Sequence, residues 1–322
     1  MLEIVRYTNS MRAIWDDVVT RSLNGTFLHT RNFYDHNALN DEDDCSFLYY
    51  KKNKAIAVIP CILYEKEGKL ILNSHLRATY GGFIVTDSVG VEEAVEIVEK
   101  LINEAKNLSV EEIIIRNPFR IFNLKICDET DYAMWHHGFN IKSRELETVI
   151  KLTDSNEIQS SYEPSTLRSV KKSKQYISVR QNNEFEEYWN ILSTNLLKKH
   201  GASPTHSYKD IQILINKIGP QRIRLFAGYK GSQMAGGVVV FVSNSICLHA
   251  QYIASDDAFQ EFRPLNAIID EIICWGSENN YTFLNLGTSN TNSGKSMNSG
   301  LFRFKEGFGG RNILRETMHL LI

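Results

Sequence analysis

The sequence contains one succession of patterns twice: two apolar strands around a short polar turn, a third strand, a long amphipathic helix and a buried strand. FLYYKKNKAIAVIP in the first half matches LFAGYKGSQMAGGVVV in the second in pattern, although few letters are identical. The paired strands are expected at residues 46–50 with 55–64 and 223–229 with 234–242, and the long helices at 91–107 and 264–279. Repetition of this kind predicts an internal duplication of one α/β unit.

The expected fold class is therefore α/β of the α+β kind, with two tandem lobes. Each lobe should hold a mixed, mainly antiparallel sheet flanked by helices. The stretch 151–163 is polar and precedes Pro164, which is typical of a linker. We place the domain boundary there, with an N-terminal lobe at 1–152 and a C-terminal lobe, expected to carry the active site, at 153–322.

Composition restricts the class of partner and the location. The chain has 322 residues, 36 Lys and Arg against 38 Asp and Glu, and a formal net charge of −2, which argues against a nucleic-acid backbone as the main partner. The first residues lack an apolar signal segment, and the apolar run 235–242 is too short to span a bilayer. We expect a cytoplasmic protein without a membrane span; the sequence does not predict its oligomeric state.

The five cysteines are unevenly spaced and none belongs to a CxxC pair. Two of them lie in apolar strand-like runs. This pattern predicts buried, reduced thiols and no metal site; the residues are Cys45, Cys61, Cys127, Cys247 and Cys274.

Several motifs resemble one family. The run LNLGTS at 284–289, the spacer with Gly294 and Asn298, and GLFRFKEGFGG at 300–310 resemble the Fem family of GNAT-like transferases, which add amino acids to peptidoglycan precursors. They also resemble the broader GNAT-like acyltransferases of polysaccharide loci and amino-acid acylation. Further segments that carry the resemblance are 26–36, 75–85, 197–207 and 248–275, so that it covers nearly the whole chain.

The resemblance implies two tandem GNAT-like lobes and transfer of an acyl or aminoacyl group to an amine. The acceptor would be a sugar, a nucleotide-linked cell-envelope precursor or an amino acid. It implies acyl-CoA or aminoacyl-tRNA as co-substrate and no permanently bound cofactor. The sequence departs from the family twice: stretch 255–266 lacks the glycines that let a loop cradle the CoA pyrophosphate, and the long charged coiled-coil arm associated with tRNA does not occur. A catalytically silent, GNAT-like module that binds a ligand or partner therefore stays open as the alternative.

Acyl transfer to an amine requires proton removal, stabilisation of the acyl oxygen and alignment of the reactants. By resemblance, Lys305 is the first catalytic candidate, facing the acyl oxygen or an acceptor phosphate, partly desolvated between Phe304 and Phe308. The side chain of Phe304 is expected in the core, and its backbone groups near the reaction. His249 and Tyr252 are candidates for the general base, although a histidine in an apolar strand fits a structural role equally.

The candidate binding residues form three groups. Gln251, Arg263 and Asn266 lie around the start of the second long helix, where a donor would bind; Arg263 alternatively pairs with Glu261 or Asp257. Asn298 and Tyr80 belong to the motif segments. At helical spacing, Arg168, Lys171 and Lys172 form a basic face for a nucleotide-diphosphate acceptor or an RNA end, or a merely solvated face.

Overall fold

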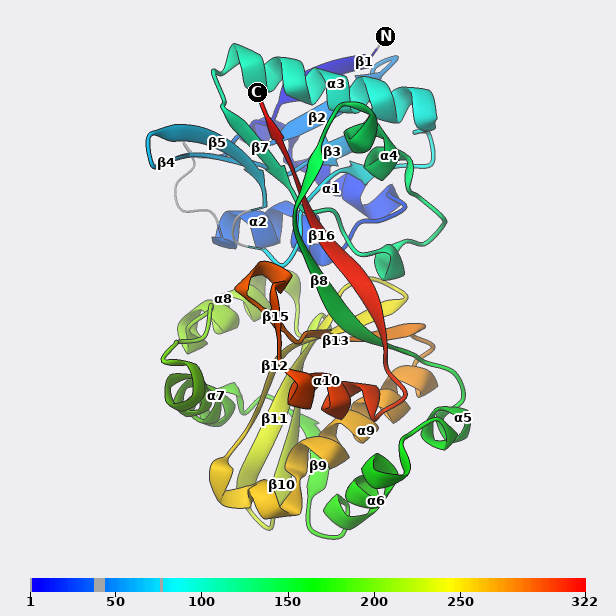
Figure 1. The fold of residues 1–322 in the computed structure, drawn as a ribbon, viewed down its shortest axis with the longest axis vertical. Coiled ribbons are helices and arrows are strands. Elements are labelled where there is room, and N and C mark those ends of the chain that lie inside the picture. Colours follow the sequence, from blue (N-terminus) through cyan, green and yellow to red (C-terminus); the bar gives the residue numbers. More distant parts are fainter. Residues whose placement is uncertain (1, 38–43, 76–77) are drawn as a thin grey trace. The chain divides into compact units, whose positions relative to one another are not determined.

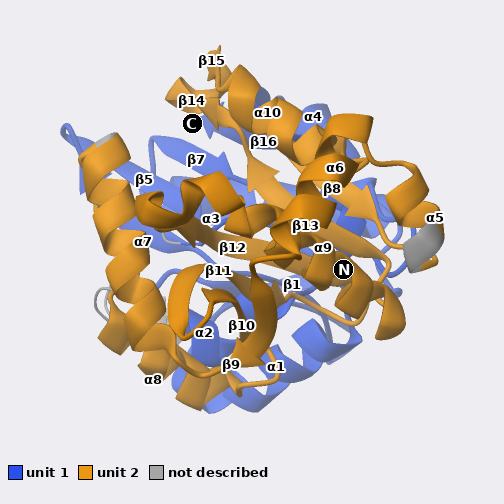
Figure 2. Ribbon diagram, turned by 90° about the horizontal axis from the view of Figure 1, so that it is seen from below, with its two compact units in different colours: residues 1–145, 314–322 blue, residues 146–313 orange. Residues whose placement is uncertain are grey.

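The computed structural model describes residues 2–37, 44–75 and 78–322. The chain forms two compact units, shown in different colours in Figure 2. Unit 1 comprises residues up to Glu145 together with Leu314–Ile322, and unit 2 comprises Leu146–Ile313. The boundary expected between residues 152 and 153 stays a prediction, since these units are not contiguous stretches of chain.

The described part of unit 1 contains two groups of paired strands and four α-helices, which Figure 1 labels. The first group is antiparallel, in the order β1 (Leu2–Arg6), β2 (Phe47–Lys51), β3 (Lys54–Ile59) and β6 (Ile84–Val85). The second runs in the order β4 (Ile62–Lys66), β5 (Lys69–Ser74), β7 (Glu112–Ile115) and β16 (Arg311–Leu321), with β5 and β7 parallel. The helices are α1 (Arg12–Arg21), α2 (Arg31–Asn37), α3 (Val91–Asn107) and α4 (Glu129–His136).

Helix α3 has the bounds that its periodicity predicts. Its apolar side chains recur at helical spacing and are buried in the core of unit 1: Ala94, Ile97, Val98, Leu101, Ile102 and Ala105. The strand expected at 55–64 is instead two strands, β3 and β4, in different groups. Pro60 separates them, because a residue without a backbone N–H cannot continue a hydrogen-bonded ladder.

Unit 2 is built on strands in the order β8 (Asn140–Lys151), β13 (Phe283–Thr288), β12 (Cys247–Ser255), β11 (Gln233–Val242), β10 (Ile223–Lys230) and β9 (Ser178–Asn182). All neighbouring pairs are antiparallel except β12 with β13. Its helices are α5 (Ser155–Ser160), α6 (Pro164–Ser173), α7 (Phe185–His200), α8 (Tyr208–Ile218), α9 (Pro264–Glu278) and α10 (Ser299–Glu306), and a short hairpin joins β14 (Asn290–Thr291) to β15 (Ser296–Met297).

Helices cover both faces of the unit 2 sheet. Helix α9 buries Ile268 and Ile272 against Val238 and Leu248 on one face. On the other face α7 lies so close that a Cβ atom at Gly237 would come within 2.7 Å of the Tyr188 ring. The period of two along a strand explains this division, because Gly237 and Val238 point to opposite faces.

The two halves of the chain share one order of elements, which confirms the expected tandem arrangement. Starting from β1 and from β9, each half runs through a strand, two helices, a hairpin, a strand, a long helix and a parallel strand, and the first half adds β4 and β6 to this order. The last three elements are β5, α3 and β7 in the first half and β12, α9 and β13 in the second. The closing strands are exchanged. Strand β8, from the first half, pairs with β13, and β16, from the second half, pairs with β7.

The polar stretch 151–163 is not an exposed linker, so that expectation is wrong. It contains α5, and both Ile158 and Tyr162 are buried in the core of unit 2. A fully buried carboxylate on α9, Asp270, holds this segment: it accepts hydrogen bonds from the Tyr162 hydroxyl at 2.9 Å and Gln159 Nε2 at 3.1 Å, and Lys174 Nζ lies 2.5 Å away.

Asp270→Ala should destabilise the protein by about 2–4 kcal/mol, because it leaves the buried Tyr162 hydroxyl without its acceptor. Urea denaturation followed by circular dichroism measures the loss. The matched control is Asp257→Ala, which removes an exposed carboxylate paired with Lys198 and should leave the midpoint unchanged. Equal midpoints for Asp270→Ala and wild type would contradict the assigned role.

Candidate active site

The parallel strands β12 and β13 diverge inside unit 2. Within the described chain, their pairing covers only residues 247–249 and 283–285. Beyond this level β12 bulges at Gln251, since Val240 pairs with Ala250 and Val239 with Tyr252. Bulges interrupt a ladder and bend the strand that carries them.

Strand β13 also leaves its regular pairing directly after Asn285, where its pairing with β12 ends. Asn285 pairs with Val149 of β8, but the next pair joins Thr288 to Glu147, so two residues of β13 oppose one of β8. Gly287 lies in this irregularity with a φ of +77°, a conformation that glycine adopts without a steric penalty. The two bulges together leave the ends of β12 and β13 apart.

Lys305 of α10 reaches the bulged end of β13. Its side chain is buried, 3% exposed, and its Nζ donates hydrogen bonds to the carbonyl oxygens of Gly287 at 2.7 Å and Thr288 at 2.8 Å. Burial lowers the pKa of Lys305 to about 8, and the Glu147 carboxylate opposes this shift. An ammonium group carries three donors, so one remains for a further acceptor. The Lys305 ammonium is therefore largely desolvated.

Three buried polar atoms near this end of β13 and the bulge of β12 have no hydrogen-bond partner among the described residues: Gln251 Oε1, Asn285 Nδ2 and Ser289 Oγ. The other amide atom of Asn285, Oδ1, accepts from the Gly287 N–H at 2.8 Å. A buried polar group left unpaired costs about 1–3 kcal/mol, so these atoms are places where a bound amide or hydroxyl gains a hydrogen bond. Asn285 and Ser289 lie in the motif LNLGTS, but the sequence analysis did not assign them a role.

A buried tyrosine–histidine pair follows the bulge of β12. The hydroxyl of Tyr252 lies 2.6 Å from His206 Nδ1, and Trp189 Nε1 donates to the His206 carbonyl at 3.0 Å. Burial raises the pKa of Tyr252 to about 12, so this phenol is neutral at physiological pH. The sequence analysis missed His206, which lies in the loop between α7 and α8. His249, also buried, occupies the position of β12 paired with Asn285.

The start of α9 differs from the expectation in one contact. Arg263 has a left-handed backbone, with φ 52°, and precedes Pro264 of the helix. Its guanidinium donates to Ser169 of α6, whereas Asp257 pairs with Lys198, so Arg263 does not form the alternative ion pair with Asp257. Asn266 is buried in the first turn. The stretch without glycine forms a 3-10 helix, Asp257–Phe262, instead of a phosphate-binding loop.

Of the remaining candidates, three are exposed basic residues and one caps a helix. Arg168, Lys171 and Lys172 are exposed on α6. The Asn298 side chain caps α10, accepting from the Leu301 N–H at 3.0 Å, and its own N–H donates to the Ser289 carbonyl at 2.8 Å. It thus positions the helix that carries Lys305.

Two aromatic candidates are packing residues. Phe304 packs edge-on against Phe308, with ring centroids 5.4 Å apart. Tyr80 lies in the core of unit 1, where its hydroxyl donates to Thr26 Oγ1 at 3.1 Å. The structure therefore brings Lys305 and Asn298 to the end of β13, packs Phe304 against the core of unit 2, and places His249, Gln251 and Tyr252 on β12.

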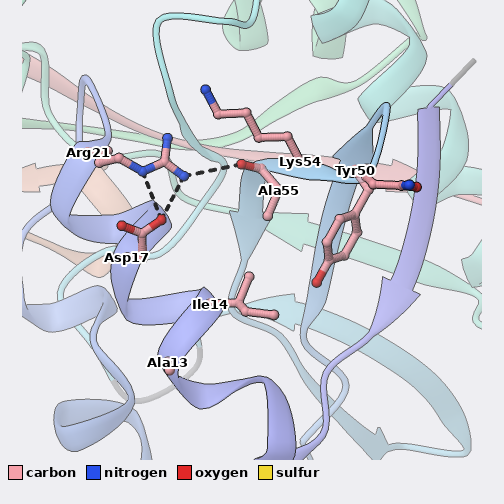
Figure 3. Close-up of a pocket in the computed structure, with 8 residues that line it drawn as sticks. Ala13, Ile14, Asp17, Arg21, Tyr50, Lys54 and Ala55 are labelled. Carbon is pink, nitrogen blue, oxygen red and sulfur yellow. Dashed lines mark hydrogen bonds and ion pairs between the residues drawn. The ribbon is translucent and has the colours of Figure 1, made fainter.

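A pocket of about 550 Å³ lies on unit 1, between α1 and the β2–β3 hairpin. Figure 3 draws the residues that line it. Ile14 and Tyr50 line it, as does Arg21, which is paired with Asp17 at 2.8 Å. None of the candidate residues lines this pocket. Across the described residues no cluster of His, Cys, Asp and Glu could hold a metal ion, and none of the described helices combines the length and apolarity needed to cross a membrane.

Comparisons with solved structures agree with this architecture. The chain is similar to FemX, with a TM-score of 0.72 and 13% identity over 99% of this chain and 97% of that one. It is also similar to the C-terminal domain of a putative lysylphosphatidylglycerol synthetase from Agrobacterium fabrum, with a TM-score of 0.61 and 9% identity over 96% and 91%. A tandem GNAT protein from the clavulanic acid biosynthesis pathway gives 0.55 and 9% over 100% and 98%.

No protein-family model matches the sequence, and no curated protein matches it either. At these identities the likeness concerns the fold. The chain has the Fem-like, tandem GNAT-type fold, as its motifs predict.

The buried charge of Lys305 should make stability depend on pH. Its pKa is about 8 in the folded protein against an ordinary value of 10.5, so the unfolded chain binds the proton more tightly between these values. The free-energy cost of burying the charged Lys305 is fully present below pH 8. It is relieved as the pH rises toward 10.5 and the buried amine loses its proton. The free energy of unfolding of wild type minus that of Lys305→Met should therefore rise by about 2 kcal/mol from pH 7 to pH 10.

Urea denaturation of both proteins across this pH range measures the difference. Lys171→Met serves as the control, because Lys171 is exposed on α6, and its difference from wild type should stay flat. A flat difference for Lys305→Met as well would show that Lys305 is not a desolvated cation.

Proposed function

We propose that this protein transfers an acyl or aminoacyl group from an activated donor to an amine, with the reaction centred on unit 2. The observation that carries the proposal is the divergence of β12 and β13 with a buried lysine at its end. Strands that separate expose backbone N–H and C=O groups, and an extended donor satisfies such groups by lying between them.

Lys305 is the proposed electrophilic residue. Its ammonium is buried and held by two carbonyl oxygens, so its remaining N–H is pre-aligned. In a site with little water, a fixed cation stabilises the negative charge that develops on the acyl oxygen or is carried by an acceptor phosphate. Because the carbonyl contacts exist before substrate binds, little reorganisation is needed during the reaction.

The proton of the acceptor amine needs a route out. His249 and the His206–Tyr252 pair are the proposed candidates, because a neutral imidazole accepts a proton near neutral pH. The unpaired Gln251 Oε1 and Asn285 Nδ2 offer one acceptor and one donor, which suits alignment of an amide-containing substrate.

The residues at the start of α9 suggest which class of acyl donor the protein uses. The 3-10 helix Asp257–Phe262 removes the glycine loop that cradles a pyrophosphate, while Arg263 and the N-terminus of α9 still attract an anion. An acyl thioester or an aminoacyl-tRNA is the proposed donor. Exposed Arg168, Lys171 and Lys172 on α6 would then contact phosphates of the donor or of a nucleotide-sugar acceptor.

Binding without catalysis is the second candidate, and one observation favours it. Lys305 already donates to two carbonyl groups, a contact that would equally serve to brace the bulge of β13. Such a module would bind ligand and transfer nothing.

A thermal-shift panel with acetyl-CoA, long-chain acyl-CoA, UDP-sugars and aminoacyl-tRNA, followed by a radiolabel transfer assay on each hit, separates the two functions. A ligand that binds only the native state raises the melting temperature. Stabilisation with transfer of label supports the proposal; stabilisation without transfer to any amine offered supports the binding module; neither effect contradicts both.

Once the transfer assay has identified a donor and an acceptor, Lys305→Met should lower kcat for that reaction by about 10²–10³ and leave KM nearly unchanged. The reason is that the lost interaction acts mainly on the transition state. Lys171→Ala is the contrasting variant: loss of an exposed phosphate contact should raise KM and spare kcat. Circular dichroism checks that both variants fold. Unchanged turnover in folded Lys305→Met would remove the lysine from the reaction.

A further inference from the structure

An exposed apolar surface lies on unit 1, whereas the residues of the proposed reaction belong to unit 2. It comprises the loop that leads into α4 and the outer side of that helix. Its large side chains are strongly exposed: Ile126 is 94% exposed, Trp135 68%, and Leu124 and Tyr132 each 47%. We call these four residues the α4 surface. Figure 1 shows the chain before α4 looping out from the rest of unit 1.

The neighbouring residues anchor this surface while leaving its apolar groups outside. Cys127 and Phe122 are buried, and Asn123 Nδ2 donates to the Cys127 carbonyl at 3.2 Å, so the loop is tied down on both sides of Ile126. In α4, Ala133 and Met134 face the core. Exposure of Ile126 and Trp135 is thus imposed by a well-packed backbone.

The composition of the α4 surface favours one occupant. Trp and Tyr three positions apart present amphipathic rings, with centroids 6.1 Å apart, and these residue types concentrate at the depth of lipid headgroups. Lys125 stands between Leu124 and Ile126, and a lysine beside inserted apolar residues extends its ammonium back to the headgroups.

The shape and the charge of the α4 surface also favour a lipid interface. A side chain that is 94% exposed projects from the surface, so Ile126 suits insertion into a deformable interface better than packing in a groove. Residues 119–137 carry two basic and three acidic side chains, which gives no attraction to an anionic surface.

We propose that the α4 surface docks this protein on the interface of a zwitterionic lipid bilayer by inserting Ile126, Leu124, Tyr132 and Trp135. The docking is peripheral and driven by apolar burial, so it depends little on salt or on anionic lipid. It concerns a surface of unit 1 and holds whichever reaction unit 2 performs.

Tryptophan fluorescence tests the proposal directly, because Trp135 is exposed, whereas Trp15 and Trp189 are buried and Trp275 is partly buried in the core of unit 2. The full-length protein is titrated with phosphatidylcholine vesicles with and without brominated acyl chains. We expect a blue shift and quenching by the brominated lipid, and the same partition coefficient at 0.1 and at about 0.5 M salt, since screening acts on charge alone.

Ile126→Ser and Trp135→Ala should each weaken vesicle co-sedimentation about tenfold, because each removes one inserted side chain. Both positions are exposed, so the fold should survive. The matched control is Leu197→Ser, which removes an equally exposed leucine, 67% exposed, from α7 of unit 2 and should leave co-sedimentation unchanged.

Three results would overturn the proposal: no quenching at millimolar lipid; binding that requires anionic lipid and disappears with salt; or self-association in the ultracentrifuge that depends on Trp135 while vesicles stay unbound. The last result would assign the α4 surface to a second copy of the chain.

Discussion

The contact between Lys305 and the bulged end of β13 connects most of the features of unit 2. A strand that leaves its ladder frees carbonyl groups that need donors, and a buried ammonium needs acceptors. The Lys305 Nζ and the carbonyls of Gly287 and Thr288 satisfy each other, at 2.7 and 2.8 Å. Each group would be costly alone. Together they stabilise an irregular strand end without water and fix where β13 turns toward Ser289.

The helix that supplies the lysine is tied to the same strand end. The backbone N–H of Asn298 donates to the Ser289 carbonyl, and its side chain caps the first turn of α10. The cap therefore fixes the start of the helix and, two turns later, the position of the ammonium. Within residues 284–310, these hydrogen bonds join the strand end, the cap and the lysine into one unit.

Local patterns predicted the elements of this fold far better than their pairing. The helix at 91–107 has its predicted bounds because an apolar period is a local signal. The exchange of β8 and β16 was not predicted, since no local pattern states which strand a partner will be. Pro60 could have shown that 55–64 is two strands, and the alternation around Ile158 and Tyr162 is too short to mark a buried segment.

The candidate site shows the same limit. Lys305 was found through its motif, whereas His206 was missed because its partner Tyr252 lies 46 residues further along the chain. Tyr80 was selected from a motif segment, but the structure buries it in the core of unit 1 beside Thr26. A sequence motif identifies functional residues that lie close together along the chain. Pairs such as His206 and Tyr252, which come together only when distant segments pack, can be identified only from the folded structure.

Comparison of the two halves supports placing the chemistry in unit 2. In unit 1 the parallel strands β5 and β7 pair over four residues up to Ser74 and Ile115, and backbone bonding continues as the Arg116 N–H donates to the Ser74 carbonyl. The first turn of α3 carries Glu92 and Glu93, and the Glu93 carboxylate accepts from the Gly90 N–H. A carboxylate there occupies the donors and repels an anion.

Unit 2 differs from unit 1 in both the pairing of its parallel strands and the charge at the start of its long helix. Strands β12 and β13 part after three paired residues, and the first turn of α9 has no acidic side chain and follows Arg263. The anionic, extended donor of the proposed function would therefore meet unfavourable charge and paired strands at α3, but neither of these at α9. Under the proposed function, a half of the chain needs separated strands only where a donor lies between them. A half that binds no donor gains stability when its strands stay paired and its helix is capped by its own carboxylate, and unit 1 has both features.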